Sequence, residues 1–235
     1  MKKQKTACMA WILLFLFAAS LQSCLDDSDN EDSPLFAIGT VKVIEGKNYY
    51  FALDEGSKLY PGDTTAIRNY AIVDGQRAFV YFNKLDEVMK GYDYNARIIH
   101  IENVLTKDIY FMPAEKNDSI GDDRINATNF WITGNYLNIK YQFYHSNHAS
   151  KKHMLNLIVS QTAADDNNRQ DYVNLEFRHN AYDDSQSILG TGLVSFKLNN
   201  ISDLLKEKKG LSIRIKSLYD GERIVTINYP NKQRK

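Results

Sequence analysis

Runs of alternating apolar and polar residues follow one another through most of the chain after residue 34, and no long stretch has helical spacing. Alternation places every second side chain on the same face of a strand, so each run predicts a β-strand with one buried face. Gly46 and Gly75 mark tight turns between neighbouring runs, because glycine tolerates the positive φ that hairpin turns need. The chain is therefore expected to be all-β.

The runs fall into two blocks, separated at residues 113–123 by a polar segment that contains proline and glycine. We interpret this segment as a linker between two domains. Roughly five strands in the short first block favour a small barrel over an open sheet. Within that block, proline and glycine at residues 59–63 are expected to interrupt the strands. The runs of the first block are 36–44, 49–53, 66–73, 77–82, 97–105 and 108–112.

Seven further runs follow the linker, and their number and spacing favour a β-sandwich. One short helix is expected at residues 202–209, because Ser202 can cap its N-terminus and Gly210 can end it. Leu204 and Leu205 would then face inward. The runs of this second block are 129–133, 136–144, 153–160, 172–177, 192–198, 211–218 and 223–229.

The N-terminus has a different character, because three lysines among the first five residues precede an apolar run of 13 residues at positions 7–19. Such a run is short for a membrane span, which needs about 20 residues, but it suits a secretory signal peptide. Residues 21–24 (LQSC) then resemble a lipobox. We expect residues 1–23 to be a signal peptide and Cys24 to carry diacylglycerol and a further acyl chain such as palmitate. An uncleaved anchor helix over residues 6–25 is the alternative.

Five of the eight residues from Leu25 to Asp32 are acidic, so residues 24–34 are expected to form a solvated tether. Two or more acyl chains on Cys24 would anchor the protein firmly in a membrane. An acidic cluster directly after a lipidated cysteine resembles the surface-export signal of Bacteroidetes lipoproteins. This resemblance implies a lipid-anchored protein of the outer membrane at the cell surface. A periplasmic orientation stays open.

Charge and cysteine content narrow the range of functions. The chain has 29 basic and 29 acidic residues, so it lacks the positive charge expected of a protein that binds nucleic acid. Cys8 belongs to the expected signal peptide and Cys24 to the lipid anchor, which leaves the folded domains without a disulfide or a thiol nucleophile. Residues 190–195 (GTGLVS) lack the third glycine of a dinucleotide loop and open a strand pattern. No cofactor is expected.

Two loops contain residue types that can bind metals. His145, His148 and His153 are close in sequence, but they share their loop with lysines and have no neighbouring Asp, Glu or Cys to complete a site. We therefore expect a solvated loop without a metal. In the second loop, Asp166 begins a run that fails the EF-hand pattern, because Asp171 stands where that pattern has glycine. An irregular calcium site in this loop stays open.

The order of these features resembles the NigD-like lipoproteins. The lipobox and the acidic segment are followed by FAIGTVKVIEGKNYYFALDEGSKLYPGD at residues 36–63, which carries the most specific part of the likeness. The resemblance implies an N-terminal OB-type five-stranded barrel at residues 35–113 and a C-terminal β-sandwich at residues 124–232. It implies no activity, because none is settled for the family.

OB-type barrels bind oligonucleotides or sugars on one aromatic face, and Tyr49 and Tyr50 are the candidates for such a face. Neighbouring strand residues point to opposite sides, so at least one of Tyr49, Tyr50 and Phe51 should belong to the core. Two triplets, DTT and DSI, are similar to the O-glycosylation motif of exported Bacteroidetes proteins. This likeness implies modification at Thr64 and Ser119.

Three classes of function follow from these features. The first is a non-enzymatic envelope lipoprotein that is held in the membrane by its lipid anchor and binds a protein or glycan partner, but no nucleic acid. The second is a protective lipoprotein of the bacteriocin-immunity type, which the resemblance to the NigD-like proteins implies. The third is a hydrolase whose catalytic residues are scattered along the chain, a pattern that a single sequence cannot reveal.

Overall fold

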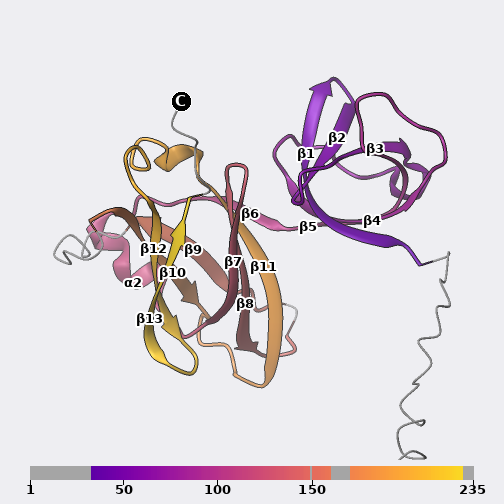
Figure 1. Ribbon diagram of the computed structural model, residues 1–235. Helices are drawn as coiled ribbons and strands as arrows, with labels where there is room; N and C mark the ends of the chain where they lie inside the picture. Colours follow the sequence, from indigo (N-terminus) through magenta and orange to yellow (C-terminus); the bar gives the residue numbers. More distant parts are fainter. Residues whose placement is uncertain (1–32, 149, 160–169, 230–235) are drawn as a thin grey trace, which may run out of the picture. The chain divides into compact units, whose positions relative to one another are not determined.

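The computed structural model describes residues 33–148, 150–159 and 170–229 (Figure 1). Residues 34–235 make up one compact unit, to which the elements below belong. The expected signal peptide, Cys24, the acidic residues that follow it and Asp166 lie outside the described residues.

Five strands form a closed barrel in the order β1-β2-β3-β5-β4, and β1 also pairs with β4 to complete the circle (Figure 1). Within the barrel the β3–β5 pair is parallel and the other pairs are antiparallel. A five-stranded barrel of this kind is the architecture of the OB fold, so the expected fold class is confirmed. The strands are β1 (Leu35–Glu45), β2 (Asn48–Leu53), β3 (Lys58–Asp63), β4 (Arg77–Lys84) and β5 (Tyr94–Asn103).

Strict alternation in β2 builds one side of the barrel core. Tyr49, Phe51 and Leu53 are buried, whereas Tyr50 and Ala52 between them are partly exposed. The rings of Tyr49 and Phe51 meet edge to face with centroids 5.5 Å apart. Truncating a fully buried phenylalanine to alanine costs about 3–5 kcal/mol, so the inward residues of β2 matter for stability. The core comprises Val41, Tyr49, Phe51, Leu53, Leu59, Ala78, Val80, Phe82, Ala96 and Ile98.

Strand β3 lies in the segment that we expected to interrupt the strands. Leu59 is fully buried and pairs with Phe51 of β2 on one side and with Tyr94 of β5 on the other. The ladder between β3 and β5 shifts register directly after Pro61. Proline and glycine are therefore accommodated at an irregular point of a short strand, and burial of one leucine outweighs their breaking tendency.

Residues 66–73, in contrast, do not form the strand that we expected. They contain the end of a short 3₁₀ helix, η1 (Thr65–Ile67), and then irregular chain. Their apolar residues nevertheless pack against the barrel core, as Ile67, Tyr70 and Ile72 do. The Tyr70 hydroxyl donates a hydrogen bond of 2.9 Å to the Asn103 side chain. An apolar run covering the barrel surface thus resembled a strand in sequence.

The second part of the chain forms two four-stranded sheets, β13-β12-β10-β9 and β6-β11-β8-β7, which confirms the expected β-sandwich (Figure 1). Residues from both sheets share one core, in which Phe177 of β10 meets Phe196 of β11 edge to face at 6.0 Å. The strands are β6 (Leu105–Asp108), β7 (Asn126–Thr133), β8 (Tyr136–His145), β9 (Met154–Val159), β10 (Tyr172–Asn180), β11 (Ile188–Lys197), β12 (Gly210–Ser217) and β13 (Gly221–Asn228).

The chain passes from barrel to sandwich at an earlier point than we expected from the sequence. We assigned residues 105–112 to the first block, but β6 pairs in parallel with β11 of the sandwich. The segment expected to be a linker, 113–123, contains η2 (Ala114–Lys116) and the one-turn α2 (Asn117–Ile120). The amide of Asp123 donates a 2.8 Å hydrogen bond to the carbonyl of His179, so the end of this segment is held to β10.

The helix that we expected at residues 202–209 is not an α-helix. A 3₁₀ helix, η5 (Asn199–Ile201), is followed by turns through residue 207. Glu207 has a positive φ of 65°, which is incompatible with a continuing right-handed helix. Leu204 is 40% exposed, whereas Leu205 packs against the sandwich core.

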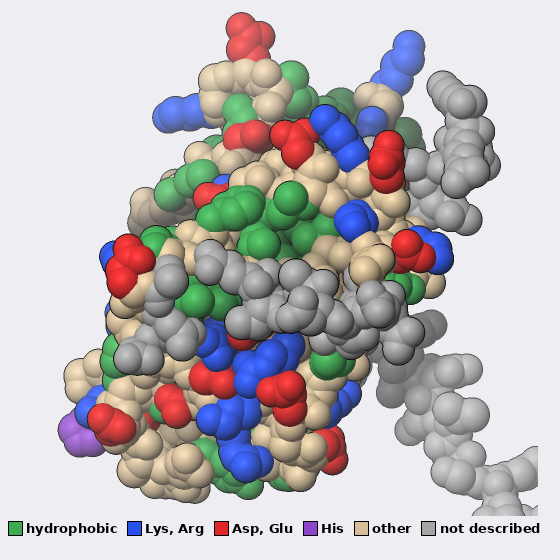
Figure 2. All heavy atoms as spheres, turned by 90° about the vertical axis from the view of Figure 1, so that its left-hand side faces the viewer, with side chains coloured by type: hydrophobic (Ala, Val, Ile, Leu, Met, Phe, Trp, Pro, Cys, Tyr) green, Lys and Arg blue, Asp and Glu red, His purple; other side chains and the backbone are tan. Residues whose placement is uncertain are grey.

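Interleaved charges of β10, β12 and β13 form a network with Asp122. The Arg214 guanidinium bonds Asp122 at 3.0 Å and Glu222 at 2.8 Å, and Arg178 reaches Asp122 at 3.0 Å. Burial alone would raise the pKa of Asp122, but hydrogen bonds from Arg214 and the charges of both arginines lower it. Figure 2 shows basic and acidic side chains gathered together on this side of the molecule. The charges largely neutralise one another and stabilise the fold locally.

A fully buried arginine links residues of the barrel and the sandwich. Arg77 of β4 forms a bidentate ion pair with Asp54, at 2.6 and 2.7 Å. Its second Nη atom also donates to the Asn138 side chain at 3.0 Å, and the Trp131 indole donates to Asp54 at 3.0 Å. The Tyr136 ring lies 5.5 Å from the guanidinium carbon. The network therefore joins β4, the end of β2 and strands β7 and β8.

Candidate binding site

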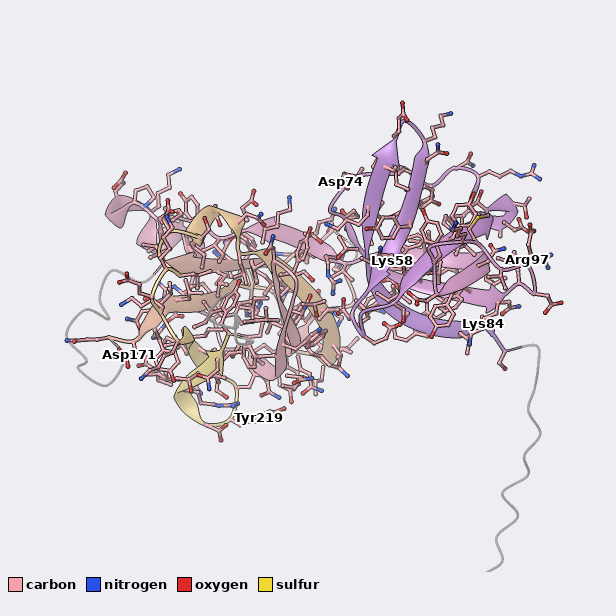
Figure 3. All side chains as sticks on the ribbon, turned by 45° about the horizontal axis from the view of Figure 1, so that its top comes forward. Lys58, Asp74, Lys84, Arg97, Asp171 and Tyr219 are labelled. Atoms are coloured by element: carbon pink, nitrogen blue, oxygen red, sulfur yellow. The ribbon has the colours of Figure 1, made fainter. Side chains whose placement is uncertain are left out.

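Three tyrosines from separate segments converge on the outside of the barrel. Tyr50 comes from β2, Tyr60 from β3 and Tyr92 from the loop between β4 and β5. The Tyr92 ring lies 5.8 Å from the Tyr50 ring and 5.2 Å from the Tyr60 ring. Lys58, labelled in Figure 3, places its ammonium group 5.9 Å from the centre of the Tyr50 ring. We call these four residues the tyrosine face.

The strand pattern explains which tyrosine faces outward. In β2, Tyr49 is 7% exposed and belongs to the core, so it cannot contact a partner directly. Burial raises the pKa of the Tyr49 hydroxyl. Tyr50, one residue later, lies on the opposite side of the strand. In β3, Lys58 and Tyr60 flank the buried Leu59 and so share the outer side.

The loop that carries Tyr92 is anchored at both of its ends. The amide of Lys58 donates a 2.8 Å hydrogen bond to the Asp93 carboxylate, and the amide of Asp93 donates a 2.9 Å bond to the carbonyl of Lys58. The Asn95 side chain donates to the carbonyl of Glu87 at 2.8 Å. These bonds hold the loop against β3 and fix Tyr92 beside Tyr60.

The position of the tyrosine face is the usual position for ligands on an OB barrel, whose β2–β3 surface and β4–β5 loop bind oligosaccharides and oligonucleotides. Tyrosine offers a broad amphipathic contact surface at low entropic cost. Within the described residues, the hydroxyls of Tyr50, Tyr60 and Tyr92 make no hydrogen bond to the protein. They are therefore available to a partner. The arrangement is suited to binding, because three aromatic rings and their hydroxyl groups lie side by side at the surface.

A concave surface with a volume of about 560 Å³ lies between residues of the barrel and Trp131 of β7. Its lining is mostly apolar and includes Phe36, Tyr94 and Trp131. The carboxylate of Asp54 in its wall is already bonded to Arg77 and Trp131. The groove therefore presents few free polar groups that could orient a ligand.

The loop histidines do not form the shared cluster that their spacing in sequence could suggest. His148 is exposed, whereas the Nδ1 atom of His145 bonds the carbonyl of Ser146 at 2.6 Å. His153 instead contacts His179 and Asp184, both distant in sequence. Within the described residues, no group of three His, Cys, Asp or Glu side chains is arranged so that it could hold a metal ion.

Two arrangements resemble parts of a hydrolase site but lack the rest. Ser195 is fully buried, and its hydroxyl donates a 2.7 Å bond to Asn138 inside the sandwich. His153 bonds Asp184 at 3.1 Å, but the other ring nitrogen of His153 faces the imidazole of His179 and not a hydroxyl. A general base needs a nucleophile within hydrogen-bond reach, so neither arrangement can carry out acyl transfer as it stands.

The two candidate glycosylation residues lie in surface segments. Thr64 directly follows β3, next to Asp63, whose carboxylate accepts bonds from the amide and hydroxyl of Thr65. Ser119 is exposed in α2, and its hydroxyl donates to the carbonyl of Lys116 at 2.9 Å. Modification of either residue stays a prediction.

Sequence reasoning missed three of the four members of the tyrosine face, namely Lys58, Tyr60 and Tyr92. Tyr60 lies in the segment expected to break the strands, although its alternation with Lys58 and Leu59 is a usable strand signal. Tyr92 lies in a loop, and nothing in the local sequence shows that this loop folds back onto β3.

Among the described residues, no helix is long and apolar enough to span a bilayer.

Comparison with known proteins identifies both halves of the chain. Residues 38–104 match the NigD-like N-terminal OB domain, and residues 108–229 match the NigD-like C-terminal beta sandwich domain. A solved protein from Parabacteroides distasonis ATCC 8503, described as toxin related, is 30% identical and has a TM-score of 0.67. The match covers 85% of this chain and 94% of that protein. Comparison with curated proteins gives no match.

Two further solved structures are similar. A protein of unknown function from Bacteroides vulgatus ATCC 8482 is 27% identical, with a TM-score of 0.70 over 86% of this chain and 93% of its own. A NigD-like immunity protein from Bacteroides caccae ATCC 43185 is 14% identical, with a TM-score of 0.60 over 84% and 97%, a likeness in fold alone. The resemblance seen in the sequence is thereby confirmed, and the chain belongs to the NigD-like family.

Proposed function

We propose that this protein is a lipoprotein of the outer membrane, displayed at the cell surface, that binds a protein or glycan partner through the tyrosine face and catalyses no reaction. The observation that carries the proposal is the convergence of Tyr50, Tyr60 and Tyr92 on the ligand-binding side of an OB barrel. Three separate segments contribute to this surface, and two hydrogen bonds between Lys58 and Asp93 hold the loop of Tyr92 in place.

The envelope location is supported by the sequence. A signal peptide, a lipobox ending at Cys24 and a run of acids are the features of an exported, lipid-anchored chain. An acidic segment between lipid and barrel would leave the tyrosine face free to meet a partner. The near balance of basic and acidic residues argues against nucleic acid as that partner.

The test is affinity capture with the intact lipoprotein from its native membrane, followed by measurement of binding to whatever is captured. Tyr50→Ala combined with Tyr92→Ala should weaken binding at least tenfold, because removing an interface aromatic costs about 2 kcal/mol or more at a hot spot. Tyr219→Ala is the matched control, since Tyr219 is 60% exposed and lies at the β12–β13 turn (Figure 3). Equal binding by both variants would contradict the proposal, and turnover of the captured molecule would favour the hydrolase alternative.

A second candidate function is immunity against a bacteriocin. It is favoured by the shared fold with a protein described as a NigD-like immunity protein. In that case, deleting the gene should make the cell sensitive to a toxin produced by its own strain or its neighbours, and the lipidated protein should restore resistance. If the deletion strain resists every such toxin to the same degree as the parent strain, the immunity function is contradicted and only the first function remains.

A further inference from the structure

A chain of hydrogen bonds runs through two buried histidines at one end of the sandwich. His179, at the end of β10, bonds the carbonyl of Arg124 through Nδ1 at 3.2 Å and the Nδ1 atom of His153 through Nε2 at 2.8 Å. The Nε2 atom of His153 bonds the carboxylate of Asp184 at 3.1 Å. We call these three side chains the histidine clasp, because they join β10, the start of β9 and the loop between β10 and β11.

The clasp is shielded from water. The side chains of His153 and Asp184 are each 3% exposed, and His179 is 2% exposed. The Phe143 ring stacks on both imidazoles, with centroids 4.5 Å from His153 and 5.0 Å from His179.

Counting protons shows that two neutral histidines cannot make these three bonds. Both ends of the chain are acceptors, since a carbonyl and an ionised carboxylate have no proton to give. The three bonds therefore need three protons on four ring nitrogens, whereas two neutral imidazoles carry only two. The third proton makes one ring an imidazolium, and its position next to the carboxylate of Asp184 places the charge on His153.

Asp184 is held in its ionised form. Its carboxylate accepts hydrogen bonds from the amides of Ser146 and Ser185, at 2.8 and 2.9 Å. Hydrogen bonds from Ser146 are the main reason why the pKa of Asp184 lies well below its usual value. Burial lowers the pKa of His179, which keeps that ring neutral. The assignment of one charge to His153 and none to His179 is consistent with the lowered pKa of Asp184 and with the lowered pKa of His179.

Other charged and titratable groups face the clasp across a cavity of about 250 Å³ beside His179. The carboxylate of Asp123 acts to raise the pKa of His179, against the effect of burial. The remaining groups that line this cavity are Arg124 before β7, Tyr144 of β8 and Lys216 of β12. His145 lies against the Phe143 ring, with centroids 5.9 Å apart.

We propose that His153, His179 and Asp184 form a buried proton-binding site that closes this end of the sandwich only while the histidine pair holds a single extra proton. Loss of that proton leaves two nitrogen lone pairs, or a lone pair and a carboxylate, facing each other. Gain of a second proton places two N–H groups at the 2.8 Å contact between the rings. In either case one of the three bonds is lost, and the segment around Ser146 and the loop around Asp184 are released.

The sign of the pH dependence follows from the number of protons bound. Above the ordinary histidine pKa of about 6.5, the folded pair holds one proton more than the unfolded chain, so stability falls as pH rises. Below that value, the unfolded chain takes up a second proton that the folded clasp excludes, so stability falls as pH decreases. A difference of one proton changes the unfolding equilibrium constant by about tenfold per pH unit. Stability should therefore be highest near pH 6.5.

The direct test is ¹⁵N NMR of histidine side chains in the 34–235 fragment, which contains the region shared almost end to end with solved relatives. At neutral pH, His153 should carry protons on both ring nitrogens and His179 on Nδ1 alone. The signals of the exposed His100 and His148 in the same spectrum serve as internal references for the signals of the clasp. One proton on each ring of the clasp between pH 6 and pH 7 would overturn the proposal without any variant.

Two variants with the same change of charge test the pairing. Asp184→Asn removes the carboxylate of the clasp and should remove the extra proton and flatten the pH dependence of unfolding above pH 6.5. Asp183→Asn is the matched control, because Asp183 is exposed and has a positive φ of 56° that asparagine tolerates. The control should behave as the wild type. An Asp184→Asn protein that keeps the extra proton would contradict the assigned role of Asp184.

Discussion

The ion pair between Asp54 and Arg77 gives a prediction in which the two partners are not equivalent. Arg77 is fully buried, whereas the Asp54 side chain is 18% exposed. Asp54→Ala therefore leaves a charged guanidinium inside the protein with no carboxylate, a change that costs about 3–5 kcal/mol. Arg77→Met leaves a carboxylate that water can partly reach and that still accepts the bond from Trp131, so we expect a smaller cost of about 1–3 kcal/mol.

The double variant distinguishes an ion pair from two independent contacts. With both charges removed, no buried charge lacks a partner, so the combined loss should be smaller than the sum of the single losses by about 2 kcal/mol. The Arg77 guanidinium also bonds Thr40 at 3.1 Å and Asn138 at 3.0 Å, and these bonds disappear in every variant that lacks the arginine. The absence of these two bonds accounts for the loss of stability that remains in the double variant.

Urea unfolding of the 34–235 fragment provides the assay. Of the two tryptophans in the chain, only Trp131 remains in this fragment, and its indole donates directly to Asp54. Its fluorescence therefore reports both on unfolding and on the network itself. Losses that add up within about 0.5 kcal/mol, or a greater loss for Arg77→Met than for Asp54→Ala, would refute the reasoning.

Three further changes have defined outcomes. Gly210→Ala should destabilise the sandwich measurably in urea unfolding. A Cβ atom at this position would lie 1.9 Å from the carbonyl oxygen of Ile227, a backbone atom that cannot move aside. Wild-type stability of the variant would contradict this. Hydrogen bonds from Thr65 and Arg97 lower the pKa of Asp63 to about 2. The stabilising effect of the Asp63 carboxylate should therefore be complete above pH 4 and disappear as pH falls toward 2. An ordinary pKa for Asp63 in an NMR titration would contradict this prediction. Replacing the expected lipidation residue, Cys24→Ala, should move the protein out of the detergent phase, and unchanged partitioning would refute lipidation.

The sequence was informative wherever structure depends on local alternation. The pattern around Tyr49, Tyr50 and Phe51 correctly required that part of this run belong to the core, and the turns at Gly46 and Gly75 have the expected positive φ of 56° and 76°. All seven strands expected in the second block are present. A period of two is determined by neighbours in the chain, so it can be recognised without knowledge of the partner strand.

Features that depend on distant partners could not be found in this way. The four residues of β6 belong to the sandwich only because they pair with β11, nearly 90 residues later. The Pro- and Gly-containing segment around Leu59 forms a strand because β2 and β5 lie on either side of it. The histidine clasp is likewise assembled from His153, His179 and Asp184, which lie up to 31 residues apart in the sequence.

The central claim is that the tyrosine face contacts a partner at the cell envelope, and site-specific photo-cross-linking in living cells tests it most directly. A photoreactive phenylalanine derivative placed at residue 92, between Tyr50 and Tyr60, should form a cross-linked product of defined mass. The same group at residue 219, on the exposed β12–β13 turn, should form none. Efficient cross-linking from residue 219 with none from residue 92 would contradict the assignment of the binding surface to the barrel.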